Sequence, residues 1–147
     1  MNDKPTILLV DDSVNDLFLM RRAFRKAAFN VPLLEAHDGE EAISYLTGVS
    51  PYGDRIQFPL PEVVLLDLKM PKIDGFELLT WVRAQAGIRR LTMIVLTAST
   101  LTEDIDRAFD CGASGYLVKP SSLEELVAMV ECLRGWIQVS RYASLNA

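Results

Sequence analysis

Short apolar runs alternate along the chain with amphipathic segments. Runs without polar alternation are typical of strands buried on both faces of a sheet. Strands are predicted at residues 7–10, 31–36, 62–67, 93–98 and 115–118. The intervening segments carry apolar residues at helical spacing. Helices are predicted at residues 13–30, 40–48, 75–87, 103–112 and 122–140.

Several predicted helix ends carry local signals. Asp38 followed by Glu41 forms the pattern of a capping box, and Gly48 is suited to ending the same helix. Ser121 or Ser122 is expected to begin the last helix. These signals place the helix boundaries independently of the apolar pattern.

The alternation of strands and helices predicts an α/β fold with parallel βαβ units and helices on both faces of the sheet. The length of 147 residues suits one domain, and half of the residues are hydrophobic. We expect this domain to span residues 1–139, with a loose tail at residues 140–147 and no effector domain. Residues 49–61 hold three prolines and a glycine, which predicts a long loop.

Chemically active side chains stand where four of the predicted strands end. These residues are Asp11, Asp12, Asp67, Thr97 and Lys119. In an open parallel sheet the carboxyl ends of the strands share one edge, and ligands bind there. Any one of the acids could be a helix cap or a surface ion pair. The full set at one edge indicates a binding site.

The residue types at this edge fit a metal and a phosphoryl group. Clustered carboxylates repel one another, and a hard divalent cation relieves that repulsion. Mg²⁺ prefers octahedral oxygen coordination and takes only a few protein carboxylates. A lysine supplies positive charge for a phosphate or for a carboxylate, and a threonine hydroxyl can donate to a phosphoryl oxygen.

Charge and composition disfavour other classes of protein. The formal net charge of -5 argues against broad nucleic-acid binding, although a local basic patch stays open. Cys111 and Cys132 lie far apart, and His37 is the single histidine, so neither a zinc site nor a Cys/His nucleophile is favoured. The first residues form neither a signal peptide nor a membrane span. The expected location is the cytoplasm, without membrane insertion.

Four motifs resemble the receiver domain of two-component response regulators. They are ILLVDDS, VVLLDLKMPKIDG, VLTAS and GASGYLVKP, and the resemblance covers residues 6–139. It implies a flavodoxin-like (βα)5 three-layer sandwich with a five-stranded parallel sheet of order 2-1-3-4-5. The long loop at residues 49–61 and the segment LRGWI also resemble stand-alone receivers that accompany phytochrome-like kinases.

The resemblance implies a role for each residue of the edge. Asp67 is expected to accept a phosphoryl group from a phosphohistidine on a sensor histidine kinase. Asp11, Asp12, Asp67 and the backbone carbonyl of Lys69 are expected to bind Mg²⁺, for which Mn²⁺ can substitute. The site's remaining two residues, Thr97 and Lys119, are expected to contact the phosphoryl oxygens.

Two further expectations follow from the resemblance. Tyr116 is expected to turn inward as Thr97 engages the phosphoryl group, which makes the pair a switch. The peptide bond between Lys119 and Pro120 is a candidate for the cis form, since an X-Pro bond prefers trans by only about 0.5–1 kcal/mol.

The expected function is that of a single-domain response regulator in a phosphorelay, a phosphoacceptor rather than an enzyme. Phosphorylation of Asp67 would switch a protein-interaction face toward a downstream target. Alternatively, the chain could relay the phosphoryl group to a histidine phosphotransfer protein, or serve as a binding module that is never phosphorylated. A phosphatase is disfavoured because Lys69 stands where such enzymes carry a second acid.

The last predicted helix carries more apolar surface than one buried face requires. One stripe comprises Leu126, Val130, Leu133 and Ile137, and a second comprises Met129, Cys132 and Trp136. With the helix near residues 101–112, in which Ile105, Ala108 and Phe109 are predicted to face inward, this surface is predicted to bind a partner or a second copy of the chain.

The lifetime of the phosphoryl group depends on which side chains flank an attacking water. Lys69 and Ser99 lie two residues beyond Asp67 and Thr97. Because Lys69 lacks a carboxylate or amide that would orient water, a long-lived phosphoryl state is predicted.

Overall fold

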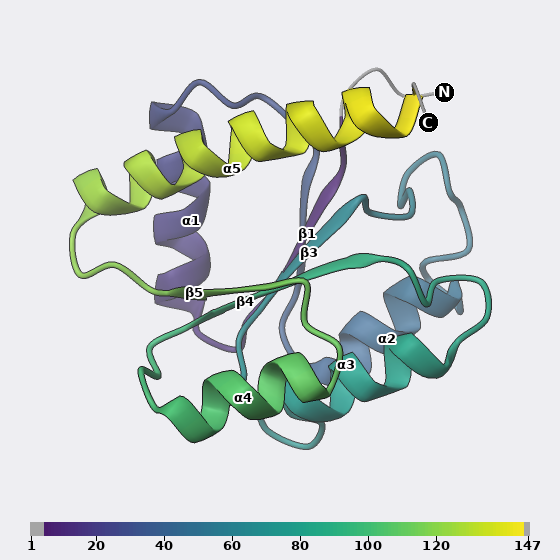
Figure 1. Ribbon diagram of the computed structural model, residues 1–147. Coiled ribbons are helices and arrows are strands. Elements are labelled where there is room, and N and C mark those ends of the chain that lie inside the picture. The colour runs from purple at the N-terminus through teal and green to yellow at the C-terminus, as the bar shows by residue number, and fades with distance from the viewer. Residues whose placement is uncertain (1–4, 146–147) are drawn as a thin grey trace.

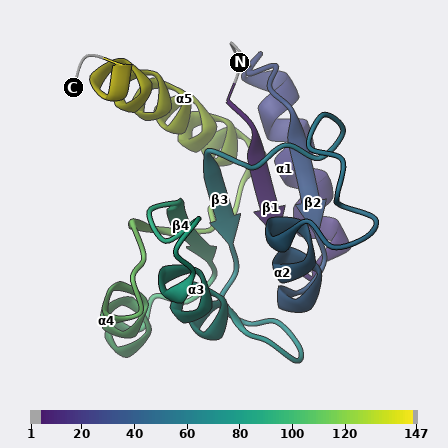
Figure 2. The same cartoon turned by 90° about the vertical axis from the view of Figure 1, so that its right-hand side faces the viewer.

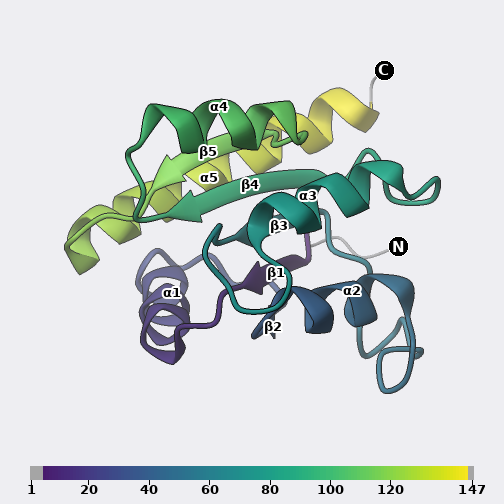
Figure 3. The same cartoon turned by 90° about the horizontal axis from the view of Figure 1, so that it is seen from below.

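The computed structural model describes residues 5–145, with side chains to residue 140. In this part of the chain one parallel sheet has the order β2-β1-β3-β4-β5, which confirms the predicted order and is seen across the molecule in Figure 3. The strands are β1 (Ile7–Val10), β2 (Leu33–Ala36), β3 (Val63–Leu66), β4 (Thr92–Thr97) and β5 (Gly115–Val118).

Helices cover both faces of the sheet. They are α1 (Val14–Lys26), α2 (Gly39–Thr47), α3 (Gly75–Ala84), α4 (Thr102–Asp110) and α5 (Leu123–Leu145). Figure 1 shows α1 and α5 on one face, and α2, α3 and α4 on the other. The predicted three-layer arrangement is confirmed.

The core consists of two apolar layers, one on each side of the sheet. Successive side chains of a strand point to opposite faces. In β1, Ile7 and Leu9 pack with α1 and α5, whereas Leu8 and Val10 pack with α2 and α3. All four are buried, which explains why the strand is apolar without alternation. The sheet that carries the candidate site is therefore held rigidly from both sides.

The helix starts follow the sequence signals closely. Ser13 caps α1 by accepting a hydrogen bond from the backbone of Asp16, and Asp38 caps α2 by accepting one from Glu41. The Glu41 carboxylate accepts from the backbone N–H of His37, one residue before the position that a capping box predicts. Ends as well as faces of these helices are thus encoded locally.

The loop at residues 49–61 is anchored to α2. Arg55 donates hydrogen bonds to the carbonyls of Tyr45 and Leu46 at the end of that helix. The Tyr45 hydroxyl donates to the carbonyl of Pro59, and Tyr52 and Phe58 pack on the Tyr45 ring. This connection is the wide loop beside α2 and β2 in Figure 2.

Two predictions about the helices are wrong. The predicted loose tail from residue 140 is helical as far as Leu145, because α5 continues; residues 146–147 lie outside the described residues. Phe109 is 48% exposed rather than inward. Ala108 is the residue of α4 that is buried against the core. Because its side chain is small, α4 buries only a narrow face.

The candidate cis peptide is also wrong. The bond between Lys119 and Pro120 is trans, and within the described residues the cis bond is the one between Ser50 and Pro51. The small intrinsic preference of X-Pro bonds leaves the isomer to the surrounding structure, which the local sequence does not define. Within residues 5–145, no helix combines the length and apolar character needed to cross a membrane.

Candidate functional site

The parallel sheet brings the predicted site residues to one edge. Asp67 follows β3 and donates its backbone N–H to the carbonyl of Val10, so it lies beside Asp11, which follows the neighbouring strand β1. On the other side, the backbone N–H of Lys119 donates to the carbonyl of Thr97. Backbone pairing between strands therefore fixes the relative positions of these residues independently of their side-chain contacts.

Three carboxylates form a cluster at this edge. Oxygens of Asp11, Asp12 and Asp67 all lie within 4.8 Å of one another. Asp11 is buried, Asp12 is exposed and Asp67 is intermediate, so the cluster opens toward solvent. Oxygen ligands that converge at this spacing fit a hard divalent cation. The role of the Lys69 carbonyl as a further ligand stays a prediction.

Lys119 joins the edge through its ammonium. Its Nζ donates to Asp11 at 2.8 Å, to Asp16 at 2.6 Å and to Asp67 at 3.1 Å. Burial alone would lower the pKa of Lys119, but the hydrogen bonds to Asp11 and Asp16 and the charge of Asp67 raise it above its ordinary value. Lys119 therefore remains charged at physiological pH.

Burial acts in the opposite direction on Asp11. Loss of water around its carboxyl raises the pKa of Asp11, and the nearby charge of Asp67 adds to this, although Lys119 and the backbone N–H of Ser13 oppose it. An ionised Asp11 is thus costly without a cation. This electrostatic cost is what a bound metal ion would relieve.

Asp16 is a partner of Lys119 that the sequence analysis does not identify. It lies in the first turn of α1, where an acid is normally explained by the helix dipole. The signal that could have identified it is its position: α1 begins directly after Asp12, so its first turn must lie at the same edge as Lys119.

The turn after Asp67 is tightly packed against the start of α3. One Asp67 oxygen accepts from the backbone N–H of Leu68 at 2.7 Å, and the N–H of Gly75 donates to the Leu68 carbonyl at 2.9 Å. A Cβ on Gly75 would lie 2.5 Å from the Asp67 carbonyl oxygen. Only glycine allows this approach, which fixes the peptide that carries the Asp67 side chain.

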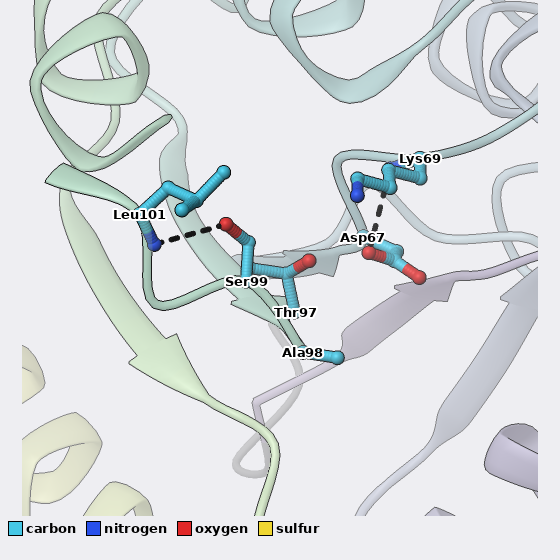
Figure 4. A pocket seen from close by; sticks show the side chains of 6 residues that line it. All are labelled: Asp67, Lys69, Thr97, Ala98, Ser99 and Leu101. Atoms are coloured by element: carbon cyan, nitrogen blue, oxygen red, sulfur yellow. Dashed lines mark hydrogen bonds between the residues drawn. The ribbon is translucent and has the colours of Figure 1, made fainter. Parts of the chain in front are cut away.

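An open pocket of about 220 Å³ lies beside the acidic cluster. Figure 4 shows Asp67 and Lys69 on one side of it and Ser99 and Leu101 on the other. Thr97, at the end of β4, also lines the pocket and is only 1% exposed. A small anionic group could enter this space and meet both the Asp67 carboxylate and the end of β4.

Ser99 connects this pocket to β5 and α4. Its carbonyl accepts a hydrogen bond from the Tyr116 hydroxyl at 2.9 Å. Its own hydroxyl donates to Asp104 at 2.5 Å and accepts from the backbone N–H of Leu101 at 3.2 Å. A displacement of the β4–α4 loop would therefore be felt by Tyr116 and by the first turn of α4.

The comparison with protein families matches this geometry. The response regulator receiver domain matches residues 7–131. Among curated proteins, the probable methanogenesis regulatory protein FilR2 of Methanothrix harundinacea is 37% identical over 88% of this chain and 84% of its own length. The response regulator Rcp1 of Synechocystis sp. is 30% identical over 93% of this chain and 92% of its own length.

Solved structures show the same likeness in three dimensions. Response regulator RPA3017, described in red light signalling of R. palustris, has a TM-score of 0.83 and 32% identity, covering 88% of this chain and 90% of its own. The phosphorylated cyanobacterial phytochrome response regulator RcpA has a TM-score of 0.80 and 28% identity, with coverage of 88% and 91%. The Mn²⁺-bound form of Rcp1 has a TM-score of 0.77 and 30% identity, also with 88% and 91%. The chain therefore belongs to the family of response regulator receiver domains and works in phosphorelay signalling.

Proposed function

We propose that Asp67 is the phosphoacceptor of this receiver domain. The observation that carries the proposal is the position of its carboxylate, which lines the open pocket with Thr97 and lies 3.1 Å from the ammonium of Lys119. Phosphoryl transfer requires positioning and charge neutralisation more than a proton-transfer base. The edge offers both, since Asp67 is held by its turn and faces a fixed positive charge.

The transfer takes the phosphoryl group from a phosphohistidine of the kinase, and it is proposed to depend on Mg²⁺ as well as on side chains of this edge. A carboxylate oxygen of Asp67 attacks the phosphorus of a phosphohistidine, the P–N bond breaks, and its electron pair stays on the histidine nitrogen. Lys119 offsets the charge of the phosphoryl oxygens, and Thr97 donates a hydrogen bond to one of them. Mg²⁺, held by Asp11, Asp12, Asp67 and the Lys69 carbonyl, would supply further positive charge, and Mn²⁺ would substitute.

Phosphorylation is proposed to act on the face formed by α4, β5 and α5. When Thr97 engages the phosphoryl group, the loop that follows it moves, and the hydrogen bond between Tyr116 and the Ser99 carbonyl must change. The two arrangements then differ at the surface where partners bind. A change in the position of the Tyr116 side chain would therefore accompany the switch.

The partners are proposed from the same likeness. A sensor histidine kinase would donate the phosphoryl group, and the similarity to a phytochrome response regulator and to a regulator in red light signalling supports a phytochrome-like kinase. A downstream protein, a histidine phosphotransfer protein or a second copy of the chain would receive the signal. A location in the cytoplasm stays a prediction from the sequence.

A second candidate function is a binding module that is never phosphorylated. The complete set of chemical residues around Asp67 disfavours it. Incubation with acetyl phosphate and Mg²⁺, followed by intact mass measurement, separates the two: gain of one phosphoryl group that is lost in Asp67→Asn supports the phosphoacceptor. An unmodified wild-type chain supports the binding module.

A further inference from the structure

We propose that Asp16 is a positioning residue that holds the ammonium of Lys119. Asp16 thereby limits how strongly Lys119 binds a phosphoryl group at Asp67. This inference rests on the proposed function of Asp67. Asp16 touches neither the reacting atoms nor the acidic cluster that fits a metal, and it would act through Lys119. Asp16 would change the affinity of the site for an anion, and the site would bind an anion with or without the Asp16 carboxylate.

The hydrogen-bond donors of Lys119 are already occupied. An ammonium has three N–H groups, and the structure supplies three carboxylate acceptors for them. The contact with Asp16 is the shortest of the three at 2.6 Å, and the contact with Asp67 is the longest at 3.1 Å. A phosphoryl oxygen must therefore compete with existing acceptors for a donor of Lys119.

Asp16 and Asp67 lie in different recesses beside Lys119. Asp16 lies in a recess between α1 and α5, with Lys119 and Pro120, whereas Asp67 lies in the open pocket with Thr97. Lys119 thus lines the recess that holds Asp16, and its ammonium also contacts Asp67, which lines the open pocket. The Asp16 backbone is held by its hydrogen bond to the Ser13 hydroxyl, so this anchor for the ammonium has a fixed origin on α1.

The Asp16 carboxylate also adds to the negative charge of this edge. Three carboxylates contact the ammonium of Lys119, those of Asp11, Asp16 and Asp67, and the Asp12 carboxylate lies within 4.8 Å of two of them, Asp11 and Asp67. Replacing the Asp16 carboxylate by a neutral amide makes the edge less negative and weakens the hydrogen bond that holds one donor of Lys119. A cation should then bind more weakly and an anion more strongly. A purely structural role for Asp16 would weaken both, because both ligands need an intact edge.

The test compares two ligands on the full chain with Asp16→Asn. Titration calorimetry with Mg²⁺ alone measures the cation, and ¹⁹F nuclear magnetic resonance with beryllofluoride at saturating Mg²⁺ measures a stable phosphoryl analogue. We expect Mg²⁺ to bind roughly 2- to 5-fold more weakly and beryllofluoride roughly 3- to 10-fold more tightly than in the wild type.

Two further variants serve as controls. Asp16→Glu keeps the charge and should restore both affinities toward the wild-type values. Asp110→Asn makes the same chemical change at the exposed last position of α4 and should alter neither. Parallel loss of both affinities in Asp16→Asn, or no change in either, overturns the inference. A wild-type chain that does not bind beryllofluoride overturns the proposed function of Asp67 itself.

Discussion

Lys119 shows how single residues at the edge depend on one another. Its ammonium is largely removed from water, with a side chain only 17% exposed, and it remains charged because three carboxylates face it. Two of these carboxylates, Asp11 and Asp67, lie with Asp12 close enough to repel one another. Each charge is tolerated because of the others, so substitution of any one should alter the binding properties of the whole set.

Most of these residues, but not all, are predictable from the sequence. Asp11, Asp67 and Lys119 directly follow strands and Thr97 ends one, and the parallel sheet brings these strand ends together wherever the helices lie. Asp16 was missed because its contact with Lys119 depends on how α1 packs over the sheet. That packing is a tertiary feature which the spacing of residues along the chain does not define.

The lifetime of the phosphoryl group is predicted to depend on Lys69. Hydrolysis requires a water oxygen to attack phosphorus while the P–O bond to Asp67 breaks and its electrons return to the carboxylate. Lys69 lines the pocket, and the Ser99 hydroxyl is already engaged with Asp104, so neither orients water well. Lys69→Asn should shorten the half-life roughly 2- to 10-fold, because an amide can position water. An unchanged half-life would count against this explanation.

Tyr45 is predicted to give the stability of the chain a specific alkaline limit. Burial raises the pKa of Tyr45 from 10.0 to about 12. Between these values the unfolded chain releases the phenol proton before the folded chain does, so stability falls as pH rises. This contribution is fully present below pH 10.0 and should cost on the order of 2 kcal/mol by pH 12.

The variant Tyr45→Phe isolates that contribution. At pH 7 it should be less stable by about 1 kcal/mol, because the hydrogen bond to the Pro59 carbonyl is lost. Toward pH 12 the difference should shrink and then reverse, since phenylalanine has no proton to release. Urea unfolding of both chains across this range makes the comparison, and a difference that is independent of pH would contradict the assignment.

At the scale of elements, the junction of β3 and α3 explains why Asp67 is held so firmly. The hydrogen bond from the Gly75 N–H to the Leu68 carbonyl brings the first turn of α3 against the peptide that follows β3. The helix start and the strand end therefore behave as one unit. Motion in either should reach the carboxylate of Asp67 directly.

Gly75→Ala tests this junction. The new methyl group would lie 2.5 Å from the carbonyl oxygen of Asp67 and 2.7 Å from the Cα of Leu68, both backbone atoms that cannot yield locally. We expect a loss of roughly 2–4 kcal/mol in the free energy of unfolding, together with slower phosphorylation. Gly135→Ala is the matched control, since nothing lies within 4 Å of its Cβ position. Equal stability of the two variants would refute the packing argument.

The pattern of elements was largely predictable because strands and helices here obey simple periodicities. The exceptions lie where tertiary packing decides. Phe109 stands one residue after Ala108, and the close approach of α4 at this small residue leaves the larger ring outside. The extension of α5 to Leu145 has no counterpart in the apolar pattern, whose last clear inward residue is Ile137.

At the scale of the whole molecule, the face of α4, β5 and α5 exposes apolar side chains. The first stripe of α5 is buried as predicted, whereas Cys132 and Trp136 of the second stripe are exposed. A groove of about 280 Å³ runs between β5 and α5, lined by Tyr116, Met129 and Trp136 among others. Because Tyr116 also contacts the β4–α4 loop, a partner in this groove would sense the state of the site.

A homodimer through this face is the whole-molecule prediction. Sedimentation velocity should show association that strengthens with beryllofluoride and Mg²⁺. Trp136→Glu should raise the dissociation constant roughly tenfold, because a charge would enter an apolar interface. Phe18→Glu, at a half-exposed position on α1, is the matched control and should leave association unchanged. A strict monomer with and without beryllofluoride would exclude the homodimer.

The most direct test of the central claim is chemical trapping of the phosphoryl group. Borohydride reduces an aspartyl phosphate to homoserine, so peptide mass spectrometry of the chain, phosphorylated by acetyl phosphate with Mg²⁺ and then reduced, reveals which residue carried it. We predict homoserine at position 67 alone, with none in Asp67→Asn and much less in Lys119→Met. Homoserine at another aspartate, or none in the wild-type chain, would contradict the assignment of Asp67 as the phosphoacceptor.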